Sequence, residues 1–390
     1  MTSLPPTASD ILARAVAQVP FMVRMRQRLH QVPEVGLHLP ITQNAVLDEL
    51  RSLGLEVEFD SHSSGLSARI PGTSAETVVL RADMDALPVA ETNDLPFRSR
   101  HVGAMHACGH DLHTSMLLGL ARALTETAPR HSVILAFQSG EEFDRGAVPL
   151  LAHRNLSGVR NARTFALHVH ANLPAGSLHW RSGPFMGYGD WFEVSINGRG
   201  GHASAPQRAL SPLTPAARLA VSIDSITDLQ QQPWPTRVAT TTEILGGNSV
   251  NVIPQHASLR GTIRGKDLAT MEGIRGELRS LVAQEQSASG TQIVMNIVEG
   301  YPAVMNAPDA TAHAVSLGRD LFGDDSVREM PETSMVIEDY SYFTERWPGS
   351  MLYLGASVPG FTAFNHSPDV MFNEEAMRVG CTLLLSLANM

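Results

Sequence analysis

Short strand-like runs alternate with helical runs from Gly36 to about residue 180. The strand-like runs are TVVLRADMD, SVILAFQSG and RTFALHVH, and the helical runs are HTSMLLGLARALTE and DRGAVPLLAH. Alternation of this kind predicts an α/β layer with a largely parallel sheet. Ligand sites of such sheets lie beyond the carboxyl ends of the strands. The pattern therefore places a functional site at one edge of the sheet, where residues able to bind metal ions follow the strand-like runs.

A different pattern begins near residue 184. Four strand-like runs (WFEVSI, RVATTTEILG, ASLRGTIR and TQIVMNIV) occur with two helical runs, in the order strand–helix–strand–strand–helix–strand. This order suggests a compact α+β insert of ferredoxin-like type. Helix, strand and helix then return. We therefore expect a discontinuous α/β domain built from residues 1–183 and 299–390, with the α+β domain inserted at 184–298.

The first segment predicts a helix, because apolar residues recur at three- and four-residue steps. Two residues interrupt this pattern. Pro20 must kink the helix or open a second one, since its ring is strained in a helix interior. Arg26 falls where an apolar residue is expected.

Composition excludes several classes of protein. The hydrophobic fraction of 43% and the charged fraction of 17% are typical of a soluble globular chain, and the net charge of −10 argues against nucleic acid. No apolar run approaches the roughly 20 residues that span a bilayer. The two cysteines, Cys108 and Cys381, give no disulfide framework, and no secretory signal is recognisable at the start. A cytoplasmic protein is expected.

Two short motifs hold residues suited to metal-assisted hydrolysis. Cys108 and His110 stand two apart in MHACGHDLH, where a thiolate and an imidazole can face one ion. Glu141 and Glu142 follow the apolar run VILAF, and a ligand beside a free general base is what such chemistry requires. Taken alone, each motif has an ordinary alternative. Cys108 and His110 could be a buried cysteine with an incidental histidine, and Glu141 and Glu142 could lie in a solvated turn.

Further candidates follow other strand-like runs. His168 ends one of them, and His170 points to the same side of an extended segment, so one could bind metal while the other contacts substrate. His366 lies in the loop FNHSPD, and loop residues often carry function. Asp83 at a strand end could orient a ligand histidine, although strand-end polarity explains it equally well. The order and number of these motifs favour a dinuclear metallohydrolase.

His202 lies in GRGGHASAP within the inserted domain. The glycine spacing there resembles a dinucleotide-binding fingerprint, but Pro206 falls in the first turns of the helix that such a site needs. The glycines more simply present His202 on a tightly turned loop.

The motifs in this order resemble a known group of enzymes. They are RQRLHQVPEVG, LRADMDALPV, MHACGHDLHTSMLLG, FQSGEEFDRGA, ALHVH, NGRGGHASAP, GGNSVNVIPQHASLRGTIR, EDYSYF and NHSPD. The set is similar to the amidohydrolases that include hippurate hydrolase and the plant indole-acetyl-amino-acid hydrolases, within the aminoacylase–zinc carboxypeptidase superfamily. The resemblance implies a catalytic α/β domain with two metal ions, and an inserted lid domain through which subunits form a homodimer.

The resemblance also implies a role for individual residues. The implied metal ligands are Cys108, as a bridge, with His110, Glu142, His168 and His366. Glu141 corresponds to the general base, and His202 to a lid histidine that stabilises the oxyanion of a site across the dimer. Asn251 and Arg264 match positions that contact the substrate.

Some positions depart from the superfamily pattern. Arg81 stands where a metal-binding histidine is usual, which fits the hippurate-hydrolase branch and argues against the desuccinylase and carboxypeptidase branches. Phe143, the pair Asn373 and Glu374, and the loop QRALSP also differ from the usual motifs. These changes bear on substrate preference rather than on the chemistry.

Three functions remain open at this point. The first is a metal-dependent amidohydrolase that cleaves small N-acyl amino acids with two zinc or manganese ions, cobalt and nickel being possible as well. The second is a dipeptidase or carboxypeptidase with the same site. The third is a metal-retaining binding protein without activity, against which the Glu141–Glu142 pair speaks, because a binding module needs no free base.

Overall fold

The computed structural model describes residues 7–59, 61–142, 144–228 and 235–389 and divides the chain into two compact units. Unit 1 consists of Met1–Gly183, Met305–Pro331 and Asp339–Met390, and unit 2 consists of Pro184–Val304 and Glu332–Glu338. The second expected boundary, between residues 298 and 299, falls inside strand β13 (Gln292–Tyr301), which pairs with its neighbour almost to its end. In the structure, unit 2 continues to Val304 and also includes Glu332–Glu338.

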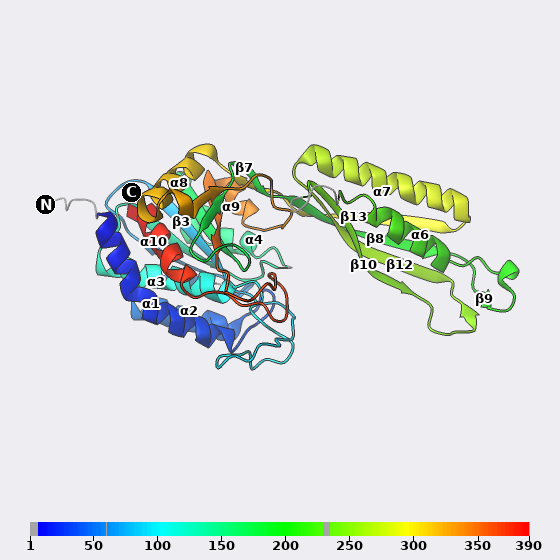
Figure 1. The fold of residues 1–390 in the computed structure, drawn as a ribbon, viewed down its shortest axis with the longest axis horizontal. Helices are drawn as coiled ribbons and strands as arrows, with labels where there is room; N and C mark the ends of the chain where they lie inside the picture. The colour runs from blue at the N-terminus through cyan, green and yellow to red at the C-terminus, as the bar shows by residue number, and fades with distance from the viewer. Residues whose placement is uncertain (1–6, 60, 143, 229–234, 390) are drawn as a thin grey trace. The chain divides into compact units, whose positions relative to one another are not determined.

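Unit 1 is built on an eight-stranded mixed sheet (Figure 1). In spatial order the strands are β1 (Val57–Phe59), β2 (Leu66–Ile70), β4 (Ser132–Gln138), β3 (Thr77–Asp83), β5 (Ala162–His170), β16 (Gly349–Gly355), β6 (Leu178–Trp180) and β15 (Val327–Glu329). The central strands β4, β3, β5 and β16 are all parallel. Their side chains are almost entirely buried, as expected of strands covered on both faces. The expected α/β layer is confirmed; its sheet, expected to be largely parallel, is parallel at the centre and has antiparallel pairs toward both edges.

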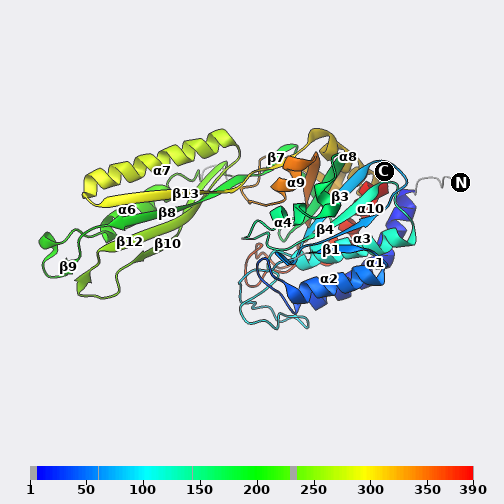
Figure 2. The same ribbon diagram turned by 180° about the vertical axis from the view of Figure 1, so that it is seen from behind.

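Most helices of unit 1 share one hydrophobic core with alternate side chains of the central strands. Figures 1 and 2 show the sheet and its helices from two opposite sides. These helices are α1 (Ala8–His30), α2 (Pro40–Ser52), α3 (His110–Glu126), α8 (Pro308–Phe322) and α10 (Ala376–Asn389). Three shorter helices, α4 (Ala147–Leu151), α5 (Arg154–Ser157) and α9 (Ser341–Arg346), contact β4, β2 and β16 respectively. The helix expected over DRGAVPLLAH is thus reduced to the five residues of α4.

Helix α1 is continuous through Pro20, so this proline opens no second helix. The helix begins with a capping box, in which Thr7 and Asp10 satisfy each other's backbone N–H groups.

Arg26 is buried on the inner face of α1 and interrupts the apolar stripe because it has charged partners there. Its guanidinium lies 3.0 Å from the carboxylate of Asp111 in α3 and 3.3 Å from that of Glu374. The same group lies over the ring of Phe97, 4.5 Å from the ring centroid. The expected apolar position is therefore filled by a neutralised cation that joins α1 to the start of α3.

Unit 2 has an antiparallel four-stranded sheet with two helices against one face. Along the chain its elements are β8 (Tyr188–Asn197), α6 (Leu213–Asp224), β10 (Arg237–Gly246), β12 (His256–Gly265), α7 (Leu268–Ser289) and β13. The spatial order β10-β12-β8-β13 places β8 and β12, the first and third strands of this sheet along the chain, at its centre. This arrangement confirms the expected ferredoxin-like insert.

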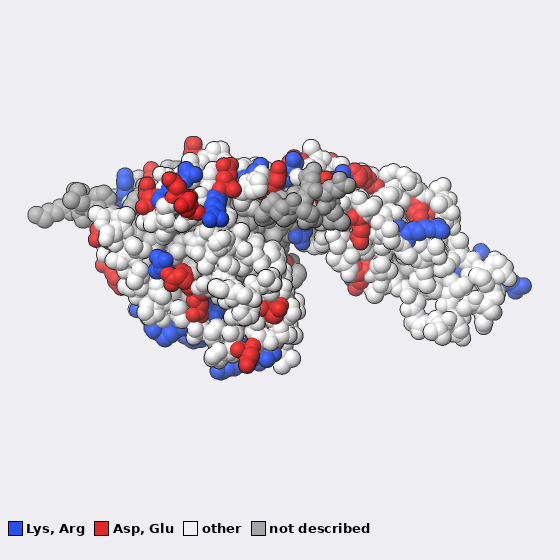
Figure 3. Space-filling view, in the orientation of Figure 1, with Lys and Arg blue, Asp and Glu red and all other residues white. Residues whose placement is uncertain are grey.

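Two small sheets lie outside the two main ones. Two-stranded sheets join β14 (Val304–Asn306) to β7 (Gly183–Met186) and β11 (Val252–Ile253) to β9 (Gly201–His202). Figure 3 shows acidic and basic side chains interspersed over unit 1 on the face in view. Within the described ranges, none of the helices has the length and apolar character needed to cross a membrane.

The Arg26 ion pairs make a prediction for stability. Replacing Arg26 with Met keeps the apolar stem but leaves the buried carboxylate of Asp111 without its guanidinium. We expect the free energy of unfolding to fall by about 3–5 kcal/mol, as when one partner of a buried pair is removed. Urea unfolding measures this change. As a control, Arg163→Met removes an exposed pair with Glu76 and should change stability by less than about 1 kcal/mol; equal effects of both variants would contradict the prediction.

Candidate metal centre

The candidate metal ligands lie at the carboxyl edge of the parallel strands in unit 1. His168 lies near the end of β5, and Glu142 lies in the loop after β4. Cys108 and His110 stand at the start of α3, and His366 lies in the loop after β16. Parallel strands bring their carboxyl ends to one edge, so residues distant in the sequence meet there.

The five side chains approach one another closely. The Sγ of Cys108 lies 3.4 Å from the Nε2 of His168 and 3.3 Å from the Nε2 of His366. The Oε1 of Glu142 lies 3.4 Å from the Nε2 of His366 and 3.9 Å from the Nε2 of His110. Two groups of possible ligands result, Cys108–His110–His168 and Cys108–Glu142–His366. The structure thus brings all five predicted ligands together, with the thiol common to both groups.

Unusual backbone conformations place two of the loops. Gly109 has a φ of +85°, and a Cβ there would lie 2.3 Å from the Cγ2 of Val169, so only glycine fits between Cys108 and His110. His366 adopts a φ of +73° although it is not glycine. A conformation of this kind costs on the order of 1–3 kcal/mol and persists only where the surroundings impose it.

The surroundings of His366 are well defined. Its N–H donates to the carbonyl of Ala107, 2.8 Å away. The side chain of the preceding Asn365 accepts from the N–H of Ala171 at 3.0 Å and donates to the carbonyl of Val169 at 3.1 Å. These bonds tie the loop to the end of β5 and to the Cys108 loop, which holds the imidazole beside the thiol.

Hydrogen bonds fix the orientation of two further histidines. The Nδ1–H of His168 donates to the carbonyl of Val169 at 2.9 Å, which leaves its Nε2 lone pair directed at the thiol side. His113 accepts from the N–H of Val169 at Nε2, so its Nδ1–H donates to Asp83, 2.5 Å away. The other oxygen of Asp83 lies 3.6 Å from the Nε2 of His110. Asp83 therefore lies beside His110, and the side chains of Asp83, His110 and His113 form a further group of possible ligand atoms.

Asp83 carries a negative charge in the interior. Burial opposes the ionised form, but the Arg81 guanidinium at 2.6 Å and the two neighbouring histidines hold the pKa of Asp83 well below its usual range. His366 shows the complementary effect. Burial would lower its pKa, but the Cys108 thiol and the Glu142 carboxylate outweigh burial and raise the pKa of His366 to about 10. The surroundings of His366 therefore favour a positive charge, whereas burial holds the pKa of His168 well below its ordinary value.

The side chains fit a bound divalent cation. Among the described residues, both ring nitrogens of His110 and the Oε1 of Glu142 are buried without a hydrogen-bond partner. Buried polar atoms of this kind need an explanation, and a metal ion supplies one. A thiol, imidazoles and a carboxylate form a donor set that suits zinc and related ions.

Glu141 lies beside this donor set and is buried. A carboxylate oxygen of Glu141 lies within 4.8 Å of possible ligand atoms of both His110 and Glu142. The adjacent glutamates thus take different places, since Glu142 approaches His366 as well as His110. A second carboxylate next to a ligand is positioned to accept a proton.

The remaining predicted residues lie in unit 2. His202 is exposed on β9, opposite Val252 of β11, and its Nδ1 lies 2.8 Å from the hydroxyl of Ser204. The carbonyl of Asn251 accepts from the N–H of Ala203 at 3.0 Å, so His202 and Asn251 belong to one small substructure. Arg264 on β12 donates from Nη1 to the carbonyl of Met335, 2.9 Å away.

Two further histidines, His170 and His113, lie near the candidate ligands. His170 packs edge-on against Tyr353 and Phe364, and its Nδ1 accepts from the N–H of Asn172, so His168 is the member of the pair that reaches the thiol. His113 was not singled out by its sequence, although a histidine three residues after His110 on α3 shares its helix face. Phe143 lies outside the described residues.

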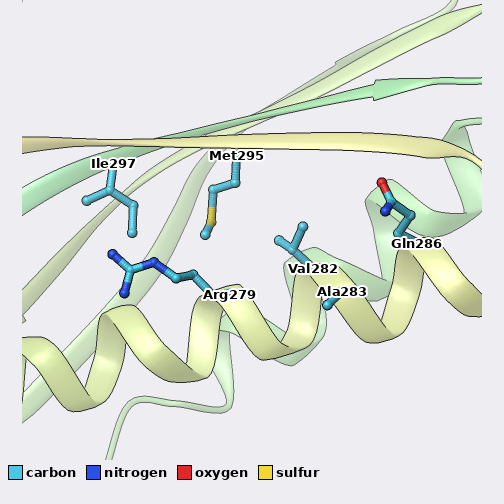
Figure 4. A pocket seen from close by; sticks show the side chains of 6 residues that line it. All are labelled: Arg279, Val282, Ala283, Gln286, Met295 and Ile297. Atoms are coloured by element: carbon cyan, nitrogen blue, oxygen red, sulfur yellow. The ribbon is translucent and has the colours of Figure 1, made fainter.

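Unit 2 also contains an open groove of about 420 Å³ between α7 and β13 (Figure 4). Its lining consists of Arg279, Val282, Ala283, Gln286, Met295 and Ile297. None of the predicted site residues lines this groove.

Comparison with known proteins agrees with this arrangement. The family model described as peptidase family M20/M25/M40 matches residues 79–390. An IAA-amino acid hydrolase ILR1-like 2 of Arabidopsis thaliana is 32% identical over 376 residues, which cover 94% of this chain and 84% of that protein. A thermostable carboxypeptidase 2 of Saccharolobus solfataricus is 33% identical, with 92% of each chain covered. An N-acetyldiaminopimelate deacetylase of Shouchella clausii is 30% identical, covering 87% and 90%.

Solved structures show the same fold. A structure from methicillin-resistant Staphylococcus aureus has a TM-score of 0.82 at 26% identity, with 98% of both chains covered. A Bacillus subtilis protein described as a dinuclear metal binding peptidase from the M20 family has a TM-score of 0.78 at 26% identity, with 96% and 98% covered. The expected superfamily is thereby confirmed, and the chain belongs to peptidase family M20/M25/M40 as a hydrolytic enzyme.

Proposed function

We propose that this enzyme cleaves the amide bond of small N-acyl amino acids, releasing a carboxylic acid and a free amino acid. The observation that carries the proposal is the pair of ligand groups that share Cys108, with Glu141 held beside the ligand candidate Glu142. The amide-cleaving names of two relatives, an IAA-amino acid hydrolase and an N-acetyldiaminopimelate deacetylase, support it.

Five side chains of this chain would hold two divalent metal ions. They are Cys108, His110, Glu142, His168 and His366. Zinc or manganese suits this mixture of sulfur, nitrogen and oxygen donors, and cobalt and nickel are compatible with it. When bound, such ions acidify a water molecule and polarise a carbonyl group.

The protein's own residues would then move protons and stabilise charge. Glu141 accepts a proton from the attacking water and later returns it to the departing amine, so the carboxylate is regenerated after each turnover. His202 donates a hydrogen bond to the oxyanion that develops at the former carbonyl oxygen. Asp83 accepts a hydrogen bond from His113 and lies beside His110, and these contacts keep the imidazole of His110 in its position as a ligand.

Substrate recognition falls to unit 2. Arg264 would bind the free carboxylate of the amino acid, for which a guanidinium offers paired donors, and Asn251 would contact the amide. We further propose that unit 2 acts as a lid and joins two subunits in a homodimer, with His202 acting on the partner's site. Both described cysteines are free, in keeping with a cytoplasmic location.

A metallo-dipeptidase or carboxypeptidase is the second candidate, because a relative of similar identity is a thermostable carboxypeptidase. A panel of N-acetyl, N-benzoyl and indole-acetyl amino acids together with dipeptides separates the two. We expect metal-dependent release of amino acid from the acyl series, with a chelated control. Release from dipeptides alone would replace the proposed function with the peptidase, and no turnover with any metal would favour a binding protein.

Metal binding should stabilise the native protein through the five ligands. At a free-metal concentration one hundred times the Kd, the free energy of unfolding should rise by roughly 2.7 kcal/mol over the chelated protein. The variant His110→Ala should lose most of this rise. Its control, His256→Ala, removes an exposed histidine of unit 2 and should retain the full rise. Thermal unfolding with elemental analysis measures both; an unchanged rise in His110→Ala would exclude this site.

Glu141 should be needed for turnover and not for metal binding. The variant Glu141→Gln keeps the size of the side chain but removes its basicity. We expect it to bind metal normally and to lose activity by at least roughly 10²–10⁴-fold, the usual contribution of a general base. Metal content and steady-state kinetics are measured together. Substantial activity in this variant would disprove the assignment of the base.

The action of His202 across the dimer can be tested by mixing subunits. His202→Ala and Glu141→Gln are each expected to be nearly inactive. In a mixed dimer, one of the two sites receives a native Glu141 and a native His202 from different subunits, so activity should return after subunit exchange. Light scattering at micromolar concentration checks the dimer. A monomer, or mixtures without recovered activity, would exclude a role in trans.

A further inference from the structure

The loop that carries Glu141 and Glu142 is closed tightly at its base. It connects the end of β4 at Gln138 to the start of α4 at Ala147. The N–H of Gly146 donates to the carbonyl of Gly140 at 3.0 Å, and a Cβ on Gly146 would lie 1.5 Å from the carbonyl oxygen of Ser139. The two ends of the loop are therefore in direct contact, and a small shift at its base would move both glutamates.

One buried carboxylate joins both ends of this loop. Asp339 precedes α9 and is fully buried. Its oxygens accept from the side-chain amide of Gln138 at 2.7 and 2.8 Å, at the residue where β4 ends. One of them also accepts from the backbone N–H of Ala147 at 3.0 Å, where α4 begins. Asp339 thus bridges the strand that enters the loop and the helix that leaves it.

A buried arginine connects this carboxylate to the candidate metal centre. Arg81 of β3 lies 3.1 Å from Asp339 through Nη2 and 2.6 Å from Asp83 through Nη1. Its Nε donates to the Oε1 of Gln138 at 2.9 Å. A guanidinium presents several donors in a fixed plane, so it fixes the relative positions of these partners. Arg81 stands where a metal-binding histidine is usual in the superfamily, and here it serves as this connector.

A carboxylate oxygen of Asp339 also lies within 4.8 Å of one of Glu141. We propose that Asp339 is a positioning residue, which holds the loop base and the neighbouring Glu141 so that Glu141 faces the attacking water. Arg81 aligns Asp339 with the carboxylate of Asp83 behind the ligands. The inference rests on the proposed role of Glu141 as general base. The Arg81 guanidinium is bonded to Gln138, Asp83 and Asp339 at once, so the position of the Asp339 carboxylate relative to the loop base is defined by several contacts. Displacement of a reacting group by about 1 Å can cost roughly 100-fold in rate, so the effect belongs to kcat.

The test is a double-mutant cycle between Asp339 and Glu141. Asp339→Asn keeps the shape of the side chain but places an amide NH₂ against the donors of Gln138, Ala147 and Arg81. We expect kcat to fall at least about ten-fold with KM changed less than about three-fold, on the fastest-cleaved member of the acyl amino acid panel. In the Glu141→Gln protein, the same substitution should change the residual kcat by less than about two-fold.

A matched control separates positioning from general destabilisation. Asp190 in unit 2 is also buried, lies 2.6 Å from the Nη2 of Arg275, and accepts from the N–H of Gly300 at 3.1 Å. Asp190→Asn therefore removes a similar ion pair far along the chain from the Glu141 loop. We expect it to lower the melting temperature and to alter kcat by the same factor whether or not Glu141 is present.

The outcomes discriminate clearly. An equal loss of kcat from Asp339→Asn in both backgrounds, or no loss at all, overturns the inference. If Asp339→Asn does not fold, Gln138→Leu removes one donor to Asp339 while keeping the Arg81 pair, and the same non-additivity is required of it. Glu141→Gln measured alone tests the proposed function separately. Near-normal activity of this variant would disprove the assignment of Glu141 as the base. An inactive Glu141→Gln together with an additive cycle would reject only the role of Asp339.

Discussion

A cluster of electron-pair donors lies at the carboxyl edge of the parallel strands, and the rest of unit 1 must hold these donors close together. The thiol of Cys108, the imidazoles of His168 and His366 and the carboxylate of Glu142 lie within 3.3–3.4 Å of a neighbour in the cluster. Lone pairs cannot satisfy one another, so these groups need a cation or protons among them. The backbone around them is also strained, as the positive φ of His366 shows. Stability lost at this edge has to be supplied by the framework behind it.

That framework relies on charges placed inside the core. Two buried arginines each hold a pair of carboxylates behind the loops that carry the site. They are Arg26, with Asp111 and Glu374, and Arg81, with Asp83 and Asp339. An apolar core would pack these helices and strands equally well, but it would not fix loop ends that consist of polar backbone and carboxylates. The arginines therefore link elements distant in the sequence at the positions where the site needs a fixed geometry.

Periodicity in the sequence predicted the α/β layer, the ferredoxin-like insert and the edge at which Cys108, His110, Glu142, His168 and His366 meet. Those predictions succeed because strand ends and helix starts are local properties of the chain. The supporting contacts are not local. Arg26 was visible only as a break in an apolar stripe, since its partner Glu374 lies 348 residues away. Arg81 was visible only as a departure from a motif, and its partner Asp339 lies 258 residues away.

Arg264 gives a reason why substrate recognition and the Glu141 loop can be connected. Its Nη1 donates to the carbonyl of Met335, a neutral acceptor, and a substrate carboxylate forms a stronger, charge-assisted bond with a guanidinium. Binding such a carboxylate would therefore compete with the bond to Met335. The chain continues from Met335 within four residues to Asp339, the carboxylate at the base of the Glu141 loop. Only three residues, of which Val336 and Ile337 are half-buried and Glu338 is buried, thus separate the Arg264 contact from the residue that we propose positions the base.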